Sequence, residues 1–202
     1  LLKEYEAANL PPFSSVAILR ASSPNKTSNV NFLNKARKYL DKETNLFIKG
    51  GIDDVWYDLD KEELVVVDYK AQSNNTPVET EAYLDSKFHQ GYKRQMDIYS
   101  WIMRRNGFNV SKDCYFVYVN GDQHFEEGML LDDYDKAKMM FDVHLIKYVS
   151  DDSWVSKTLA DLKSCLLQEN CPDHSQSGYG PKGDKPCENF VLFEGMRENN
   201  LI

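Results

Sequence analysis

The feature that most constrains the fold is a pair of apolar segments joined by a short polar turn. Residues 46–57 and 63–70 are rich in branched and aromatic side chains, and the second segment contains three successive valines. β-Branched residues favour strands, and a short apolar run bounded by polar residues is typical of a buried strand. Because the polar turn at residues 58–62 is short, the two segments are predicted to pair as a β-hairpin.

The remaining elements follow from helical spacing, strand-like runs and turn residues. Residues 88–105 are predicted to form a helix that ends at Asn106-Gly107. Further helices are expected at 31–42, 133–149 and 153–168, and further strands at 113–119 and 128–131. This order predicts an α/β (α+β) fold with a mixed central sheet flanked by helices. We expect residues 1–169 to form this domain, and residues 170–202 to be an irregular, Cys-containing tail packed on it.

The charge and the cysteine content argue against several classes of protein. Lys and Arg number 24, and Asp and Glu 32, for a formal net charge of −8. This acidity argues against a protein that coats nucleic acid non-specifically, but not against an enzyme with metal-binding carboxylates and a small basic rim. The longest apolar run, Cys114–Val119, is much shorter than the roughly 18 residues that a membrane helix needs. Four cysteines are too few for a disulfide scaffold, so we expect a reducing, cytoplasmic compartment.

Two carboxylates are predicted to face each other across the hairpin. If the turn is tight and centred between Asp60 and Lys61, Asp53 lies directly opposite Asp68. Directly opposed side chains have Cβ atoms about 4.5–5.5 Å apart, and like charges at that distance are destabilising. Two such carboxylates therefore require a cation, and their oxygen atoms suit Mg²⁺ or Mn²⁺. Lys70 lies on the same strand face as Asp68, which gives this end of the hairpin the composition of a site for phosphodiester hydrolysis.

The helix expected at residues 88–105 adds polar and basic side chains. Gln95 and Tyr99 are four residues apart and share one helix face. The basic residues that could contact phosphates are Lys35, Arg37, Lys38, Lys42, Lys93, Arg94, Arg104 and Arg105. On the alternative interpretation, Tyr99 belongs to a core stripe with Tyr92, Met96 and Met103, and the basic residues are only solvated.

Together these residues resemble the motifs of the PD-(D/E)XK nuclease superfamily, and most closely those of its RecB-like branch. Residues 50–53 match the pattern GxxD, Asp68-Tyr69-Lys70 matches DxK, and Gln95 with Tyr99 matches QxxxY. The three motifs occur in this order between residues 46 and 120.

The resemblance implies a restriction-endonuclease-like core and a nuclease that acts on DNA, in repair or recombination, with Mg²⁺ or Mn²⁺. It implies that Asp53, Asp68 and the carbonyl group of Tyr69 bind the metal ion. Lys70 would position or activate the attacking water and stabilise the developing charge. The Gln and Tyr of the helix motif would order the site and the nucleic-acid strand.

The chain departs from the RecB-like pattern upstream of the hairpin. Many RecB-like proteins have a His or Glu on a helix before the GxxD strand. Here no His precedes His89, and the nearest upstream Glu, Glu43, adjoins the strand and is not assigned a role.

The cysteines are the second departure. Some RecB-like proteins bind an iron–sulfur cluster through one Cys before the core and three after it. In this chain Cys165, Cys171 and Cys187 follow the core, Cys114 lies inside an expected strand, and no Cys precedes the core. With His174 the three late cysteines would give a zinc set whose spacing is not that of a zinc knuckle. We therefore expect reduced, unpaired cysteines rather than zinc or a cluster.

The predicted function is a divalent-metal-dependent nuclease that hydrolyses DNA phosphodiester bonds. The alternative is a noncatalytic nucleic-acid-binding or assembly module that retains the nuclease fold. The missing upstream His favours the alternative, whereas the intact set of Asp53, Asp68 and Lys70 favours the nuclease. The sequence indicates DNA as a partner, no membrane association, and no particular protein partner.

Overall fold

The computed structural model describes residues 16–18, 37–73, 81–122, 136–170 and 188–199. Contacts divide the chain into two compact units, Leu1–Lys157 and Thr158–Ile202. The first unit contains the β-sheets and the helix α3 (Gln90–Arg105). The second contains most of α4 (Val155–Leu166) and all of α5 (Glu188–Glu198).

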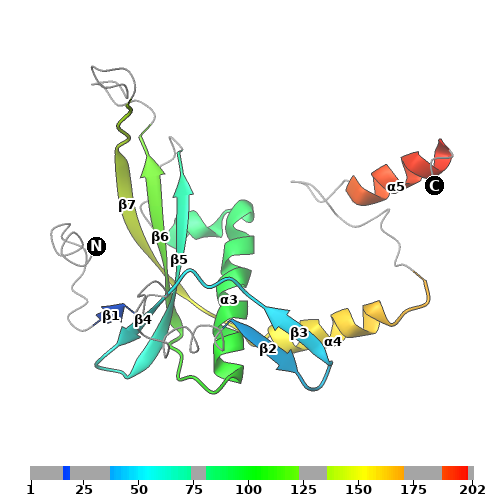
Figure 1. The fold of residues 1–202 in the computed structure, drawn as a ribbon, viewed down its shortest axis with the longest axis horizontal. Helices are drawn as coiled ribbons and strands as arrows, with labels where there is room; N and C mark the ends of the chain where they lie inside the picture. Colours follow the sequence, from blue (N-terminus) through cyan, green and yellow to red (C-terminus); the bar gives the residue numbers. More distant parts are fainter. Residues whose placement is uncertain (1–15, 19–36, 74–80, 123–135, 171–187, 200–202) are drawn as a thin grey trace. The chain divides into compact units, whose positions relative to one another are not determined.

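A five-stranded mixed sheet in the order β1-β4-β5-β6-β7 forms the centre of the first unit (Figure 1). Its strands are β1 (Val16–Ile18), β4 (Asp54–Asp58), β5 (Glu63–Gln72), β6 (Asp113–Gly121) and β7 (Phe141–Val149). β5 and β6 are parallel, and the other neighbours are antiparallel. A parallel pair needs a crossover connection, and α3 lies in it after the short 3₁₀ helices η1 (Glu81–Asp85) and η2 (Lys87–His89). The predicted α+β fold class, a mixed sheet flanked by helices, is confirmed.

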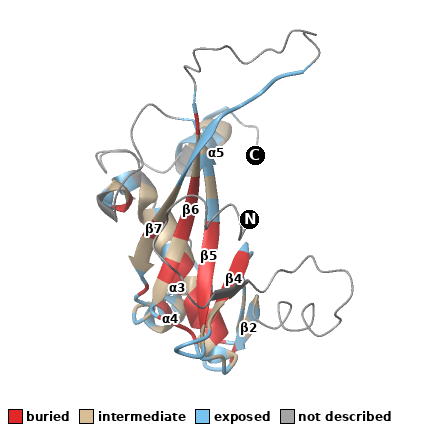
Figure 2. Cartoon of the chain, turned by 90° about the vertical axis from the view of Figure 1, so that its left-hand side faces the viewer, coloured by how far each residue is buried: buried red, intermediate tan, exposed pale blue. Residues whose placement is uncertain are grey.

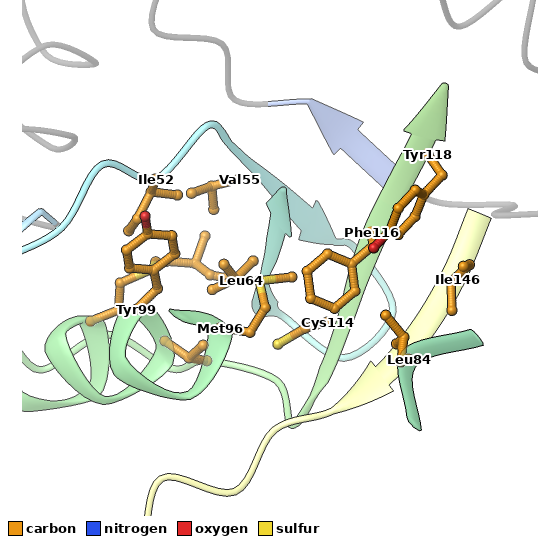
Figure 3. Close-up of a cluster of buried hydrophobic side chains, with 13 residues drawn as sticks. Ile52, Val55, Leu64, Leu84, Met96, Tyr99, Cys114, Phe116, Tyr118 and Ile146 are labelled. Carbon is orange, nitrogen blue, oxygen red and sulfur yellow. The ribbon is translucent and has the colours of Figure 1, made fainter. Parts of the chain in front are cut away.

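The core lies between α3 and one face of this sheet. Met96 and Tyr99 of α3 belong to one buried cluster with Leu64 of β5, and Tyr99 lies toward Ile52 (Figure 3). Successive residues of β5 point to opposite faces, and Val66 and Val67 are both fully buried, as expected for a central strand covered on both sides. Each buried apolar side chain contributes about 1.5–3 kcal/mol, so this packing fixes α3 against β5.

Burial along β5 changes at Asp68. The strand is buried from Leu64 to Asp68, whereas its end, from Tyr69 onward, is exposed or half-buried (Figure 2). The residues that the sequence singles out for chemistry therefore lie where the central strand emerges from the core.

Most of the strands and helices expected near this core are confirmed. The structure has the strands expected at 63–70 and 113–119 and the helices expected at 88–105 and 153–168, with shifts of a few residues at their ends. The strand expected at 46–57 is instead two strands in different sheets, because β3 (Leu46–Lys49) pairs with β2 (Lys38–Asp41) whereas β4 pairs with β5 in the central sheet.

The prediction of a helix at residues 31–42 is wrong for its second half. Residues 38–41 form β2 (Lys38–Asp41), which pairs with β3 in a small two-stranded sheet. Asp41 stabilises the turn between β2 and β3. Its Oδ2 accepts hydrogen bonds from the Thr44 amide at 3.1 Å and the Thr44 hydroxyl at 2.6 Å. Asn45 adopts a left-handed conformation there (φ 56°), which Asn tolerates well. Local turn chemistry thus overrides the helical spacing; residues 31–36 lie outside the described residues.

The prediction of a helix at residues 133–149 is also wrong. Phe141–Val149 is the edge strand β7, which pairs with β6 along its whole length. Phe141, Val143 and Leu145 alternate with polar residues, and this period of two suits a strand paired on one edge. The strand expected at 128–131 and the start of this helix lie outside the described residues.

The tail from residue 170 is not irregular throughout, because it contains α5. The Pro and Gly residues that predicted an irregular tail all lie between residues 172 and 186, before the helix begins. The predicted domain boundary at 169/170, and the packing of the tail on the domain, stay predictions. None of the helices in the described part of the chain is long and apolar enough to cross a membrane.

Candidate active site

The hairpin has the register that the sequence predicts. Asp54 pairs with Val67 and Asp58 with Glu63, so the turn is centred between Asp60 and Lys61. The register prediction is confirmed, and one further step along it places Asp53 opposite Asp68. Asp53 is the last residue before β4, so the two carboxylates meet where the hairpin ladder ends.

Asp53 and its neighbour Asp54 have different surroundings. The Tyr69 amide donates a hydrogen bond to Asp53 Oδ2 at 3.0 Å, which fixes this exposed carboxylate beside β5. Asp54 is buried and accepts hydrogen bonds from the Tyr69 hydroxyl at 2.8 Å and from the Val55 amide at 2.9 Å. Because adjacent strand residues point to opposite faces, Asp54 is committed to the fold, whereas Asp53 is available at the site.

Asp68 is an almost fully buried carboxylate, with 1% of its side chain exposed. One oxygen, Oδ2, forms an ion pair with the Lys70 ammonium, while Oδ1 has no hydrogen-bond partner among the described residues. Burial raises the pKa of Asp68; the Lys70 ammonium lowers it, and the Asp53 carboxylate raises it again. A buried polar atom without a hydrogen-bond partner costs about 1–3 kcal/mol. A cation bound to Asp68 Oδ1 would remove this cost.

The donor set at this position fits Mg²⁺ or Mn²⁺. No three His, Cys, Asp or Glu side chains gather into a metal-binding group within the described residues. Mg²⁺ usually keeps several waters and binds one or two carboxylates together with substrate phosphates, so a pair of carboxylates suffices. Asp53, Asp68 and the Tyr69 carbonyl would hold it.

Lys70 connects the hairpin with the helix motif. Its Nζ donates a hydrogen bond to Gln95 Oε1 at 3.2 Å, and Gln95 Nε2 donates one to the Tyr99 hydroxyl at 2.6 Å. The structure thus joins Asp68, Lys70, Gln95 and Tyr99 in one chain of polar contacts. The alternative interpretation of Tyr99 is also partly right, because its ring is buried in the core.

The first glycine of the hairpin motif makes room for Tyr99. A Cβ atom at Gly50 would lie 2.5 Å from Tyr99 Cε1 and 2.7 Å from Cδ1, closer than real Cβ atoms come. A Cβ at Gly51 would meet nothing within 4 Å. The GxxD and QxxxY motifs therefore fit together sterically at Gly50 and Tyr99, although 49 positions separate them in the sequence.

A family model described as PD-(D/E)XK nuclease superfamily matches residues 3–173. The chain belongs to this superfamily. The matched range includes both motifs of the hairpin and the helix that carries Gln95 and Tyr99. No curated protein and no solved structure matches the chain significantly. Membership of a nuclease superfamily supports hydrolysis of nucleic acid as the class of activity.

The basic residues divide into exposed and internally bound groups. Arg94 and Lys38 are exposed, whereas Lys93 forms an ion pair with Asp85 at 2.7 Å. Arg104 bonds to Asp152 and to the carbonyl groups of residues 110 and 111, so its guanidinium holds the fold together. Lys35 lies outside the described residues.

Two residues make contacts that the sequence analysis did not predict, since it named Arg37 as a possible phosphate contact and Tyr92 as part of a core stripe. Arg37 Nη2 donates a hydrogen bond to the Ile52 carbonyl at 3.0 Å, and its own carbonyl accepts one from the Gly50 amide at 2.8 Å. These two hydrogen bonds hold residues 50–52, the segment directly before Asp53. The ring of Tyr92 lies under the Lys70 ammonium, 4.5 Å from Nζ to the ring centroid. Neither contact has a signal in residue spacing.

The structure leaves the cysteine prediction open. Cys114 and Cys165 are free, and burial raises the pKa of Cys114. Cys171, His174 and Cys187 lie outside the described residues, so nothing tests a zinc or iron–sulfur site. Glu43 is exposed in the turn between β2 and β3.

Proposed function

We propose that this protein is a divalent-metal-dependent deoxyribonuclease of the RecB-like branch, which hydrolyses phosphodiester bonds by water attack. The observation that carries the proposal is the buried Asp68, which lies next to Asp53, is paired with Lys70 and has one oxygen without a partner in the described part of the chain. A purely structural carboxylate at this depth would have its oxygens satisfied. Superfamily membership supports the same reading.

The residues divide the chemistry between them. Asp53, Asp68 and the Tyr69 carbonyl would hold Mg²⁺ or Mn²⁺, which supplies charge stabilisation and lowers the pKa of water. Lys70 would orient the attacking water and stabilise the negative charge that develops on the phosphate. Gln95 holds Lys70 in place through its Oε1 atom.

Substrate recognition would combine this site with phosphate contacts from basic side chains. Lys38 and Arg94 are exposed and suited to this role, and Lys93 lies next to Arg94 on α3. Lys35 is proposed as a contact on its sequence position alone. Contacts of this kind position a strand but do not read its bases.

The test is cleavage of labelled single-stranded DNA, double-stranded DNA and RNA of matched sequence, with Mg²⁺, Mn²⁺ or EDTA. We expect cleavage of DNA with either metal and none with EDTA. Cleavage of RNA but not DNA would refute the proposed substrate. Binding of DNA without cleavage under any metal condition would support the alternative, a noncatalytic nucleic-acid-binding or assembly module.

A further inference from the structure

The Lys70 ammonium has a third partner besides Asp68 and Gln95. Its Nζ lies over the face of the Tyr92 ring, 4.5 Å from the centroid, within the distance of about 6 Å over which an aromatic face attracts a cation. The Lys70 side chain is only 16% exposed, so water screens this attraction weakly. A carboxylate, an amide oxygen and an aromatic face thus contact one ammonium group.

Tyr92 is itself held in place by an aromatic column. His89 stacks on Tyr92 with centroids 5.5 Å apart, and Tyr83 stacks on His89 at 4.3 Å. The Tyr83 hydroxyl donates a hydrogen bond to Gln72 Oε1 at 2.5 Å, and Gln72 lies two residues after Lys70 on the same face of β5. The two ends of the column contact Gln72 and Lys70, and both of these residues belong to β5. These contacts fix the Tyr92 ring relative to the Lys70 ammonium.

Apolar packing alone does not distinguish an aromatic ring from an aliphatic side chain at position 92. Tyr92 also packs beside Phe116, with ring centroids 6.5 Å apart, and a leucine would keep an apolar side chain there while losing the stacking on His89. Leucine has no negative ring face to attract an ammonium. Spacing on α3 places Tyr92 and Gln95 one turn apart, so the helix offers two neutral groups to Lys70.

We propose that Tyr92 is a positioning residue for Lys70 in the nuclease reaction, a role that rests on the function proposed above. Asp68 would be shared with a divalent cation, which weakens its hold on the ammonium. Gln95 and the Tyr92 ring bind the ammonium without being metal ligands. They keep Nζ directed at the site when Asp68 no longer does so.

The first experiment compares the cleavage kinetics of wild type, Tyr92→Leu, Tyr92→Phe and Tyr57→Leu. Tyr92→Leu should lower kcat about tenfold and leave KM for DNA unchanged, because a cation–π contact in a shielded site corresponds to roughly 5- to 30-fold. Tyr92→Phe keeps the ring face and should restore most of the rate. Tyr57→Leu, which removes a ring packed against the same core from β4, is the matched control and should cleave like wild type. Wild-type kcat in Tyr92→Leu would overturn the proposal.

A series of fluorinated phenylalanines at position 92 separates electrostatics from packing. Added fluorines withdraw charge from the ring face and change its size little, so kcat should fall stepwise with their number. This series also serves if Tyr92→Leu fails to fold. Equal rates across the series would show that Tyr92 only fills space, and would overturn the proposal.

A structural readout distinguishes failure of this inference from failure of the proposed function. The ring should shift the NMR signals of the Lys70 ε-methylene group upfield in wild type, and Tyr92→Leu should remove the shift. An active enzyme without this shift would refute the inference and leave the nuclease proposal intact. An enzyme that cleaves no nucleic acid but shows the shift would refute the proposed function and, with it, a role for the contact in catalysis.

Discussion

Two buried carboxylates in the first unit, Asp68 and Asp97, have nearly equal burial and opposite surroundings. Asp97 on α3 is 4% exposed and accepts three hydrogen bonds, from the Tyr148 hydroxyl at 2.9 Å, the Asp151 amide at 2.9 Å and Trp154 Nε1 at 3.0 Å. Asp68 is 1% exposed and has one oxygen without a partner among the described residues.

On the function proposed above, this difference separates a structural carboxylate, Asp97, from a functional one, Asp68. Burial alone does not distinguish them, because both groups have lost their water. Buried polar groups that serve the fold have their hydrogen bonds satisfied, and exceptions need an explanation. Asp97 connects α3 to the segment after β7, whereas Asp68 keeps an oxygen available for a ligand. The comparison can be tested by substitutions at the Asp68 site and at Asp97.

The largest expected effect is on catalysis. Lys70→Ala removes the cation beside Asp68 and should lower the cleavage rate by about 10²–10³, the usual cost of losing one group that stabilises transition-state charge. Folding by circular dichroism and most DNA binding should remain. Lys147→Ala, which breaks an ion pair with Asp113 on the same sheet, is the control and should keep the wild-type rate. Undiminished cleavage by Lys70→Ala would refute the assignment of Lys70.

The second effect falls on stability. Asp97→Ala removes the acceptor of three part-buried hydrogen bonds and should lower the free energy of unfolding by about 3–5 kcal/mol, measured by urea denaturation. Asp97→Asn keeps an acceptor for Tyr148 and Asp151 but turns an NH₂ group toward Trp154 Nε1, so its loss should be smaller. A loss equally small for both variants would mean that Asp97 does not hold this region together.

Some of the features behind these predictions can be predicted from the sequence, and others cannot. The hairpin register follows from a short turn and two apolar segments, which are local, so Asp53 and Asp68 could be paired correctly. The surroundings of Asp97 could not be foreseen, because its partners lie more than 50 positions away. The contact between Tyr92 and Lys70 could not be foreseen either, because it joins a helix and a strand and has no signal in residue spacing. The helix predicted over β7 is wrong although Phe141, Val143 and Leu145 alternate with polar residues, because the pairing with β6 that stabilises the strand is not visible in local spacing.

The third prediction concerns metal binding at Asp68. Mg²⁺ or Mn²⁺ at one hundred times its Kd should stabilise the wild type by about 2.7 kcal/mol. Asp68→Asn removes the repulsion with Asp53 and weakens the site. It should therefore melt at or above the metal-free wild type, respond less to metal, and be inactive. An equal metal-induced shift of Tm in wild type and variant would show that the ion binds elsewhere.

The same variant reports the pKa of Asp68. Because the folded state raises this pKa, it binds the proton more tightly than the unfolded chain does. The contribution of Asp68 to stability is fully present below the usual value of 3.8 and is lost as the pH rises through the raised value. Without metal, the stability of wild type relative to Asp68→Asn should thus fall from acidic toward neutral pH.

A smaller effect is expected where the two motifs touch. Gly50→Ala forces a methyl group against the Tyr99 ring and should lower the free energy of unfolding by about 1–3 kcal/mol, the usual cost of overpacking. Displacing Tyr99 disturbs Gln95, so cleavage should slow as well. Gly51→Ala adds the same methyl group one residue later, in open space, and should match wild type in both measurements. If Gly50→Ala and Gly51→Ala had the same stability and the same cleavage rate, the close fit between Gly50 and Tyr99 would have no effect on folding or on cleavage.

The smallest effect tests whether the distinction between satisfied and available groups also holds for the basic side chains of α3. Arg94 is exposed and forms no ion pair with a described residue, whereas its neighbour Lys93 is paired with Asp85. Arg94→Ala should weaken DNA binding equally for all sequences and reduce the salt slope by about one unit, since one phosphate contact is lost. Lys38→Ala should act similarly.

Fluorescence anisotropy titrations at several salt concentrations measure these slopes. Lys93→Ala should change the slope less, because its ammonium must leave Asp85 before it can reach a phosphate. If charge reversal at both Arg94 and Lys38 left affinity and slope unchanged, these residues would be only solvated surface. A larger change for Lys93 than for Arg94 would show that an internal partner does not predict which cations are free to bind DNA.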